Sequence, residues 1–176
     1  MFIRKLSAAL PDNTVCVADV GQNQIWTCNN FDIRKGRLLT SGGMGTMGYS
    51  VPCAVGAQMA SPESSVVAIC GDGSFQMQMM ELATIVQEHL PVKIIIMRNN
   101  RLGMVRELQT KNYGDHQIAV HLTEGNPDFV ALAKAYGIEA ERVSTMAEAE
   151  AAIEHLCRSD KPYLLECNVF KNESTL

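Results

Sequence analysis

The chain has 176 residues, which suits one domain with a sizeable core. Its hydrophobic content of 47%, its charged content of 19% and its net charge of −4 are typical of a globular α/β protein. No cluster of Lys and Arg, no apolar run of bilayer length and no signal peptide stand out, so we expect a cytoplasmic protein without nucleic-acid or membrane partners.

Hydrophobic periodicity and turn residues divide the chain into alternating strands and helices. The expected strands cover residues 14–20, 37–40, 65–70, 92–97, 139–143 and 163–169. The expected helices cover residues 25–29, 50–60, 76–90, 101–109, 127–136 and 145–157. Residues 110–123 show no period and predict a long loop of the kind that often forms a lid. The alternation with short connections indicates a doubly wound, mostly parallel sheet with helices on both faces.

Two of the expected helices carry recognisable end signals. Asn126 is expected to cap a helix whose first residue is Pro127, with Gly137 just past its end. Thr145 and Glu148 have the spacing of a capping box for the last helix.

The strongest functional signal is Gly71-Asp72-Gly73, followed 25 residues later by Asn99-Asn100. Each motif follows an apolar strand, and the helix between them makes the two strands parallel neighbours. Asp72 and Asn99 then share the carboxyl edge of the sheet, where open α/β sheets bind ligands. A carboxylate and an amide oxygen make half of an octahedral Mg²⁺ site, and the two glycines let a phosphate approach backbone N–H groups. The alternative of two plain turns explains neither the spacing nor the chemistry.

A second glycine pattern, G-x-G-x-x-G at residues 43–48, allows a different interpretation. With Glu63 as a ribose-binding acid, it would make the chain a dinucleotide-binding module of an oxidoreductase. The strand before this pattern is weak, and the pattern is common by chance in glycine-rich loops. A tight turn that packs a helix on the sheet is the other alternative. We favour a loop whose backbone approaches a flat ligand beside the metal site.

The cysteines and histidines do not suggest a metal centre. The six cysteines lack C-x-x-C spacing, and Cys16, Cys70 and Cys167 fall in expected strands. We interpret all six as reduced thiols rather than as a disulfide framework or a zinc site. The four histidines are scattered and are expected at the surface.

Six segments of the chain carry a family resemblance. They are VGQNQIW at 20–26, TSGGMGTMGY at 40–49, GDGSFQM at 71–77, ELAT at 81–84, NNRLGMVR at 99–106 and NPDF at 126–129. Together they resemble acetohydroxyacid synthase (acetolactate synthase) large subunits, and the Gly-Asp-Gly and Asn-Asn motifs are shared by related thiamine-diphosphate enzymes. The resemblance covers residues 1–176 as a single carboxyl-terminal domain with the thiamine-diphosphate-binding fold. It implies that the amino-terminal pyrimidine-binding domain and the middle domain are absent.

The resemblance implies two cofactors, thiamine diphosphate and Mg²⁺. Asp72, Asn99 and the backbone carbonyl of Arg101 match the protein ligands of the metal. The positions that match contacts to the diphosphate are Gly21, Gln22, Asn23, Gly71, Gly73 and Ser74.

The resemblance also implies how the reactive part of the cofactor is held. Met47 matches the apolar residue under the thiazolium ring that bends the cofactor, and the backbone of Gly45 would hold its amino group. The wall near the thiazolium and the substrate matches Leu102, Gly103, Met104 and Val105. For both Met47 and Met104, core packing is the alternative.

The implied reaction decarboxylates pyruvate and joins the two-carbon unit to a second 2-oxoacid, in branched-chain amino-acid biosynthesis. In this family the catalytic glutamate belongs to the pyrimidine-binding domain of a partner chain, and FAD binds the middle domain. We therefore expect a homo-oligomer, a regulatory subunit as a further partner that synthases often bind, and an isolated chain without activity.

Two positions depart from the family. Asn23 replaces a frequent histidine, and its amide can still donate to phosphate. Leu108 replaces the tryptophan that shapes the pocket for the second substrate, which leaves the second substrate open. The alternatives are the small subunit of a split thiamine-diphosphate 2-oxoacid decarboxylase, or a stand-alone domain that binds the metal-diphosphate without catalysis.

Overall fold

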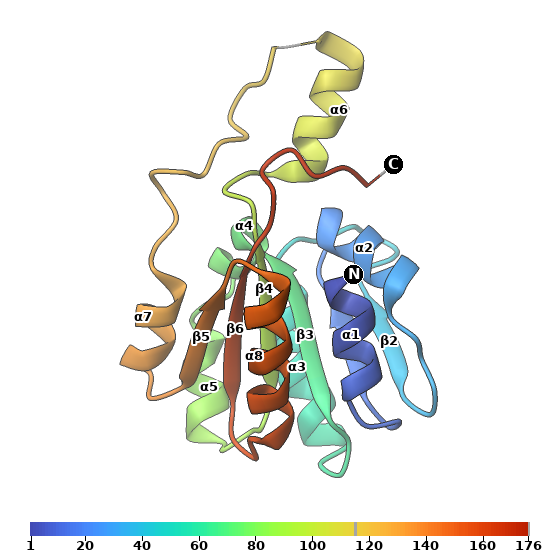
Figure 1. Cartoon of the computed structure of the whole chain (residues 1–176), viewed down its shortest axis with the longest axis vertical. Coiled ribbons are helices and arrows are strands. Elements are labelled where there is room, and N and C mark those ends of the chain that lie inside the picture. Colours follow the sequence, from blue (N-terminus) through green and yellow to red (C-terminus); the bar gives the residue numbers. More distant parts are fainter. Residues whose placement is uncertain (115, 176) are drawn as a thin grey trace.

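The computed structural model describes residues 1–114 and 116–175, and these form a layered α/β fold (Figure 1). The strands are β1 (Val15–Ala18), β2 (Arg37–Thr40), β3 (Val66–Gly71), β4 (Lys93–Arg98), β5 (Glu139–Val143) and β6 (Tyr163–Asn168). They form one sheet in the order β2-β1-β3-β4-β6-β5, and all neighbouring pairs are parallel. The predicted doubly wound sheet is confirmed.

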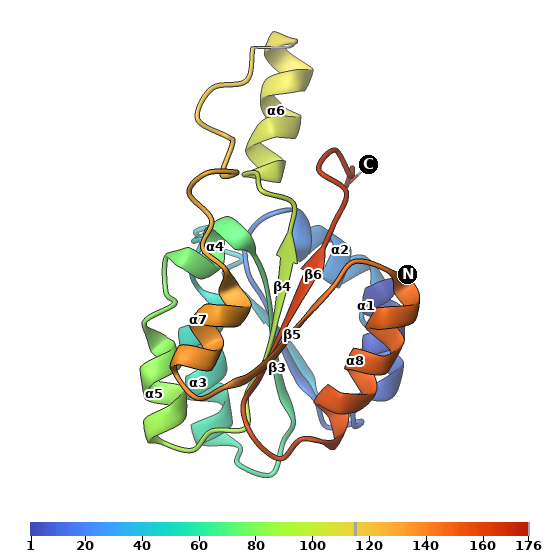
Figure 2. The same cartoon turned by 60° about the vertical axis from the view of Figure 1, so that its left-hand side comes forward.

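The helices cover both faces of this sheet (Figure 2). They are α1 (Phe2–Ala9), α2 (Gln22–Asn30), α3 (Ser50–Ala60), α4 (Asp72–Gln76), α5 (Glu81–Gln87), α6 (Gly103–Tyr113), α7 (Phe129–Ala135) and α8 (Met146–Arg158). Helices α3, α5 and α7 lie on one face, and α1 and α8 lie on the other. The sequence analysis did not predict α1.

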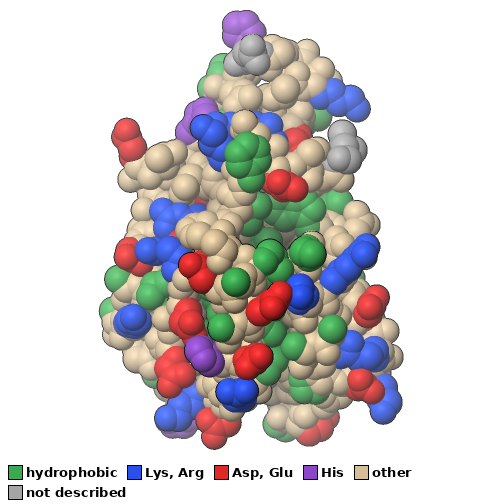
Figure 3. Space-filling view, in the orientation of Figure 1, with side chains coloured by type: hydrophobic (Ala, Val, Ile, Leu, Met, Phe, Trp, Pro, Cys, Tyr) green, Lys and Arg blue, Asp and Glu red, His purple; other side chains and the backbone are tan. Residues whose placement is uncertain are grey.

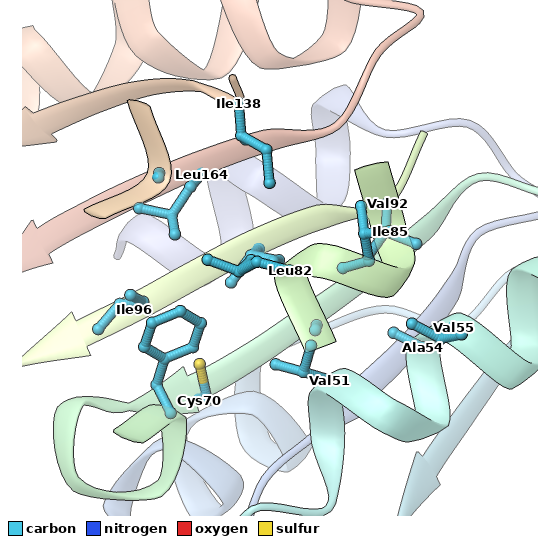
Figure 4. Packing of buried hydrophobic residues seen from close by; sticks show 14 of the residues in the cluster. Val51, Ala54, Val55, Cys70, Leu82, Ile85, Val92, Ile96, Ile138 and Leu164 are labelled. Atoms are coloured by element: carbon cyan, nitrogen blue, oxygen red, sulfur yellow. The ribbon is translucent and has the colours of Figure 1, made fainter. Parts of the chain in front are cut away.

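Two hydrophobic clusters hold the layers together, one on each face of the sheet. The alternation along β4 shows this, because Ile94 and Ile96 pack into one cluster while Ile95 and Met97 pack into the other. A strand that is buried on both faces reads as a continuous apolar run, as β4 does. Figure 4 shows the first cluster, in which Ile96 lies near Cys70 of β3, and side chains from α3 and α5 complete the cluster.

The cysteines predicted to lie in strands do so. Cys16, Cys70 and Cys167 are buried in β1, β3 and β6, and burial raises the pKa of each thiol. Raised thiol pKa values favour the protonated, less reactive form. The four histidines are exposed, as predicted.

The helix predicted over residues 76–90 is wrong in its bounds. The chain enters α4 directly after β3, and residues 77–80 separate α4 from α5. The separating turn is closed by short-range bonds such as Met77 N to Ser74 O and Glu81 N to Gln78 O, which are too tight for an α-helix. Met77 and Met80 are exposed there and Met79 is only partly buried against the core, so the segment has little buried apolar surface to keep it in one helix.

The loop predicted over residues 110–123 is also partly wrong. Helix α6 continues to Tyr113 and ends at Gly114, whose φ of +63° lies in the left-handed region. Residue 115 of the predicted loop lies outside the described residues. Helix α6 stands away from the sheet, and none of its residues is buried (Figures 1 and 2). Its lack of a packed face explains why no periodicity marked its end.

The cap predicted for the next helix is two residues too early. Asp128, not Asn126, caps α7, because its carboxylate accepts from the N–H groups of Val130 and Ala131. Gly137 follows the helix with a φ of +77°, as expected for a residue just past a helix end. The capping box of Thr145 and Glu148 on α8 is confirmed.

Candidate functional site

The carboxyl edge of the sheet brings the predicted site residues together. Strands β1, β3 and β4 are parallel neighbours, so their carboxyl ends, and the segments that follow them, lie side by side. They surround a cavity of about 360 Å³. The predicted residues that line it are Gly21, Gln22, Asn23, Met47, Gly71, Asp72, Gly73, Ser74, Asn99, Arg101, Leu102, Gly103, Met104 and Val105. Gly45, which has a φ of +63°, lies in the exposed loop beside it and does not line it.

Asp72 is the buried carboxylate of this cavity, with 1% of its surface exposed. Its Oδ2 accepts from the backbone N–H of Asn100 at 2.7 Å and from Nδ2 of Asn126 at 2.8 Å. Its Oδ1 accepts from the N–H of Gly73 at 3.1 Å. Burial raises the pKa of Asp72, and the donated hydrogen bonds oppose this shift. A cation beside the carboxylate would offset the cost of burying its charge.

Asn99 lies beside Asp72 and is held at both ends of its amide. Its Oδ1 accepts from the N–H of Arg101 at 2.9 Å, and its Nδ2 donates to Oε1 of Gln22 at 2.9 Å. Gly103 makes room for this pair, because a Cβ at that position would lie 1.8 Å from Oε1 of Gln22. The amide oxygen of Asn99 therefore has a defined position beside the carboxylate.

The side-chain oxygens of Asp72 and Asn99 are suitable ligands for a hard divalent cation. The described residues contain no group of three or more His, Cys, Asp and Glu that could hold a metal, so any cation here depends on mixed oxygen ligands. Oδ1 of Asp72 and Oδ1 of Asn99 each accept one described hydrogen bond and keep a lone pair. One carboxylate with amide and carbonyl oxygens suits Mg²⁺, which takes its remaining ligands from water and phosphate.

The glycines of the Gly-Asp-Gly motif are closely packed by neighbouring side chains. A Cβ on Gly73 would lie 2.6 Å from Cδ2 of Leu102, and one on Gly71 would lie 3.2 Å from Oδ1 of Asn23. Ser74 closes the turn, since its hydroxyl accepts from the N–H of Gly71 and donates to the carbonyl of Gly71. The turn therefore brings backbone to the cavity wall without intervening side chains.

Asn23 uses its amide differently from the expectation. Its Nδ2 donates to the backbone carbonyls of Asp19 at 2.7 Å and Ile69 at 3.4 Å. Both amide hydrogens are thus directed at the backbone in this arrangement, and neither is left for a phosphate.

Asp19 is a residue that the sequence analysis missed. It is 1% exposed, and its carboxylate accepts from the N–H groups of Gly48 at 3.0 Å and Ser50 at 2.8 Å. It therefore ties the glycine-rich loop to the end of β1 at the start of α3. An acidic residue directly after a buried strand and before Val20-Gly21 was the available signal.

A second cavity of about 580 Å³ lies on the other side of Trp26 and Met97, which line both cavities. It is bounded by α1, the start of α8 and residues 167–174, and its walls are largely apolar. Figure 3 shows hydrophobic side chains gathered in a hollow below α6, while acidic and basic side chains are interspersed over the rest of that face. The second cavity also has polar side chains in its walls, among them Ser144, Thr145 and Asn168, but its described residues include no buried carboxylate like Asp72, so the first is the better ligand site.

A doubly wound parallel sheet, with a cavity at its carboxyl edge that holds a buried carboxylate and a buried amide, is typical of a cofactor-binding α/β domain. Residues 19–167 match the family described as thiamine pyrophosphate enzyme, C-terminal TPP binding domain, and the chain belongs to this family. The resemblance to thiamine-diphosphate enzymes is thereby confirmed, and the dinucleotide-binding interpretation of residues 43–48 loses its support.

The chain is similar to acetolactate synthase large subunits. It is 41% identical over 175 residues to acetolactate synthase isozyme 2 large subunit of Escherichia coli (strain K12). The aligned region covers 99% of the chain and 32% of that protein. It is 44% identical over 165 residues to the acetolactate synthase large subunit of Pyropia yezoensis, covering 94% of the chain and 28% of that protein. It is 42% identical over 171 residues to a probable acetolactate synthase large subunit of Methanococcus aeolicus, with the same two shares. The chain thus spans about a third of the length of these relatives. In the described part of the chain, no helix has the length and apolarity needed to cross a membrane.

Proposed function

We propose that the chain is the cofactor-binding domain of an acetolactate synthase, which decarboxylates pyruvate and joins the two-carbon unit to a second 2-oxoacid. The observation that supports this most directly is the buried pair of Asp72 and Asn99 in the cavity of a thiamine pyrophosphate-binding domain. The identities of 41–44% to acetolactate synthase large subunits favour this reaction over others in the family.

The proposed roles follow the positions in the cavity. Asp72, Asn99 and the carbonyl of Arg101 hold Mg²⁺, and the metal in turn neutralises the diphosphate. The diphosphate is held by Gly21, Gln22, Gly71, Gly73 and Ser74. Asn23 is left out of this set, because both of its amide hydrogens go to backbone carbonyls. The thiazolium and substrate are enclosed by Met47, Leu102, Gly103, Met104 and Val105. The backbone of Gly45, in the loop beside the cavity, holds the amino group of the cofactor.

Thiamine diphosphate supplies the carbon acid that attacks the keto group. The chain's own contribution is to fix and enclose it. Met47 and Met104 are half-buried and face the cavity, where their flexible apolar side chains can shape the cofactor and exclude water.

The remaining parts of the proposed enzyme lie outside residues 1–176. These parts are a pyrimidine-binding domain of a partner chain with the catalytic glutamate, a middle domain with FAD, and a regulatory subunit, assembled in the cytoplasm on a homo-oligomer. The relatives, which are about three times longer than the chain, support this division.

The proposal is tested by metal-dependent binding of thiamine diphosphate. Trp26 is the single tryptophan and lines both cavities, so its fluorescence reports binding, and the Asp72→Ala variant assigns that binding to the first cavity. We expect saturable quenching by thiamine diphosphate with Mg²⁺, and its loss in Asp72→Ala. The matched control Asp160→Ala changes an exposed carboxylate at the opposite edge of the sheet and should bind normally. Quenching by NAD or FAD that survives Asp72→Ala would contradict the proposal.

Turnover tests the division between domains. The chain alone should release no acetolactate from pyruvate, because the catalytic glutamate is supplied from outside. Acetolactate made by the pure chain would overturn that division. Release of carbon dioxide without carboligation, once partner domains are added, would favour a split 2-oxoacid decarboxylase instead.

A further inference from the structure

Glu166 is a carboxylate buried in the middle of the fold, away from the cavity. It lies on β6 with no exposed surface, and it faces two guanidinium groups on neighbouring strands. Its Oε1 accepts from Nη1 of Arg98 at 2.7 Å and from Nε of Arg142 at 2.9 Å, and its Oε2 accepts from Nη2 of Arg142 at 3.1 Å. Such a cluster is stable only when every charge is paired.

The two arginines differ in what they contact beyond Glu166. Arg142 on β5 also pairs with Asp128, the cap of α7, at 2.7 Å. Arg98, at the end of β4, donates from Nε to Oδ1 of Asn100 at 2.9 Å, and its guanidinium lies 5.7 Å from the ring centre of Phe129. Arg98 therefore connects the buried cluster to the Asn-Asn motif, while Arg142 connects it to a helix end.

Asn100 has a φ of +58°, in the left-handed region that asparagine adopts more readily than most residues. Its backbone N–H donates to Oδ2 of Asp72. Its side-chain Oδ1 accepts from Arg98 and, at 2.8 Å, from Nδ2 of Asn126. The two donors hold the side chain in place, so the backbone N–H that orients Asp72 is held as well.

Asn126 completes the connection. Its Nδ2 donates to Oδ1 of Asn100 and to Oδ2 of Asp72, both at 2.8 Å, and its Oδ1 accepts from Nε2 of Gln76 at 2.7 Å. Both amide hydrogens are used, so the side chain has one orientation. Because two donors engage Oδ2 of Asp72, the other oxygen is left with the greater capacity for a cation.

We propose that Arg98, Asn100 and Asn126 are positioning residues that present Asp72 to a divalent cation, with Glu166 as the buried anchor of Arg98. This inference rests on the proposed metal role of Asp72. Hydrogen-bond partners behind a metal ligand typically change metal affinity about 10- to 100-fold when they are removed.

The test compares two variants, each of which lacks one of the two arginines that pair with Glu166. Arg98→Met breaks the connection to Asn100. Arg142→Met leaves it intact, since its described hydrogen bonds reach Glu166 and Asp128 only. Mn²⁺ affinity is measured by electron paramagnetic resonance with thiamine diphosphate at saturation, and the melting temperature is measured without metal. Asn126→Ala, a half-buried loop residue, is a third variant that spares the buried cluster.

We expect Arg98→Met and Asn126→Ala to weaken Mn²⁺ binding about tenfold or more. Arg142→Met should lower the melting temperature yet keep the Mn²⁺ affinity within about twofold, as a merely structural role of the cluster predicts. Unchanged affinity in Asn126→Ala, or equal losses in both arginine variants, would overturn the inference while the proposed function stands. If Arg98→Met does not fold, Asn126→Ala decides. An unaltered chain that binds no Mn²⁺ with thiamine diphosphate would overturn the proposed function itself.

Discussion

Gly103 is the residue at which the cavity has least space. A Cβ there would lie 1.8 Å from Oε1 of Gln22 and 2.9 Å from Nδ2 of Asn99. We predict that Gly103→Ala separates this pair, weakens binding of thiamine diphosphate and destabilises the fold by about 1–3 kcal/mol through overpacking. Chemical denaturation and Trp26 fluorescence measure the two effects.

The matched control for this glycine is Gly56→Ala. Gly56 is exposed in α3, and no atom lies within 4 Å of its added Cβ. The control should stabilise the helix by roughly 0.5–1 kcal/mol and leave cofactor binding unchanged. Normal binding in Gly103→Ala would show that the contact between Gln22 and Asn99 is dispensable.

Lys93 gives the stability a pH dependence that is unconnected with the cavity. It is 6% exposed, and its Nζ donates to the carbonyl of Ser159 at 2.8 Å. Burial lowers the pKa of Lys93 from 10.5 to about 8. Between these values the unfolded chain binds more protons than the folded chain, so the free energy of unfolding rises with pH.

Lys93→Met should remove this contribution. The free energy of unfolding of the unaltered chain, minus that of the variant, should increase between about pH 8 and 10.5 in urea titrations. A difference that stays flat or falls across this range would show that Lys93 keeps its ordinary pKa.

At the scale of single residues, the sequence predicts the residues that line the cavity better than the residues that hold them in place. Asp72 and Asn99 were predictable because each directly follows an apolar strand. Asp19 and Asn126 were not, because each acts on a partner distant in sequence: Asp19 holds Gly48, and Asn126 holds Asp72. Such contacts depend on the strand order, which a local pattern does not contain.

Among the helices and strands, α7 has an N-terminal cap whose contribution to stability can be tested. The carboxylate of Asp128 accepts from two N–H groups of its first turn and pairs with Arg142. Asp128→Ala should therefore destabilise the domain by about 1 kcal/mol. Asp128→Asn should recover most of this loss, because asparagine caps helices as well as aspartate does. Equal losses in both variants would assign the effect to the ion pair instead of the cap.

The bounds of α8 were predictable because a capping box marks its start, and those of α3 were predictable from its run of small and apolar residues. They were not predictable where exposed residues interrupt the pattern, as between α4 and α5. Asn126 shows the same limit. Its sequence position before Pro127 resembles a cap, yet its amide is engaged by Asp72 and Asn100, so the cap falls to Asp128. Tertiary contacts overrode the local preference.

On the scale of the molecule, α6 is the element with least support. It is an eleven-residue helix without a buried residue, and isolated helices of this length are marginal in water. We predict that its backbone amides exchange hydrogen faster than those of α8 by a factor on the order of ten or more. Exchange measured by mass spectrometry tests this, with α8 as the internal reference. Equal protection would mean that α6 is packed against something in solution.

The class of fold was predictable from the alternation of elements, but the strand order was not. Strand β6 lies between β4 and β5, so the last strand in sequence is not at the edge of the sheet. Polar residues in β5, among them Glu139, Glu141 and Arg142, indicate an edge strand in hindsight, since central parallel strands have near-continuous apolar runs. A single polar strand does not identify its neighbour, which is why the order required the structure.

Gln22 has a consequence for how the protein comes into being. Its amide meets Asn99, Glu107 and the carbonyl of Glu173, partners that lie 77, 85 and 151 residues further along the chain. During translation, Gln22 therefore leaves the ribosome long before the partners of its amide are made. Long-range parallel pairing is slow to form, and the intermediate exposes apolar strand faces in the meantime. The cavity is thus completed late in biosynthesis. Chaperones that act during translation would therefore act on a chain that cannot yet bind its cofactor.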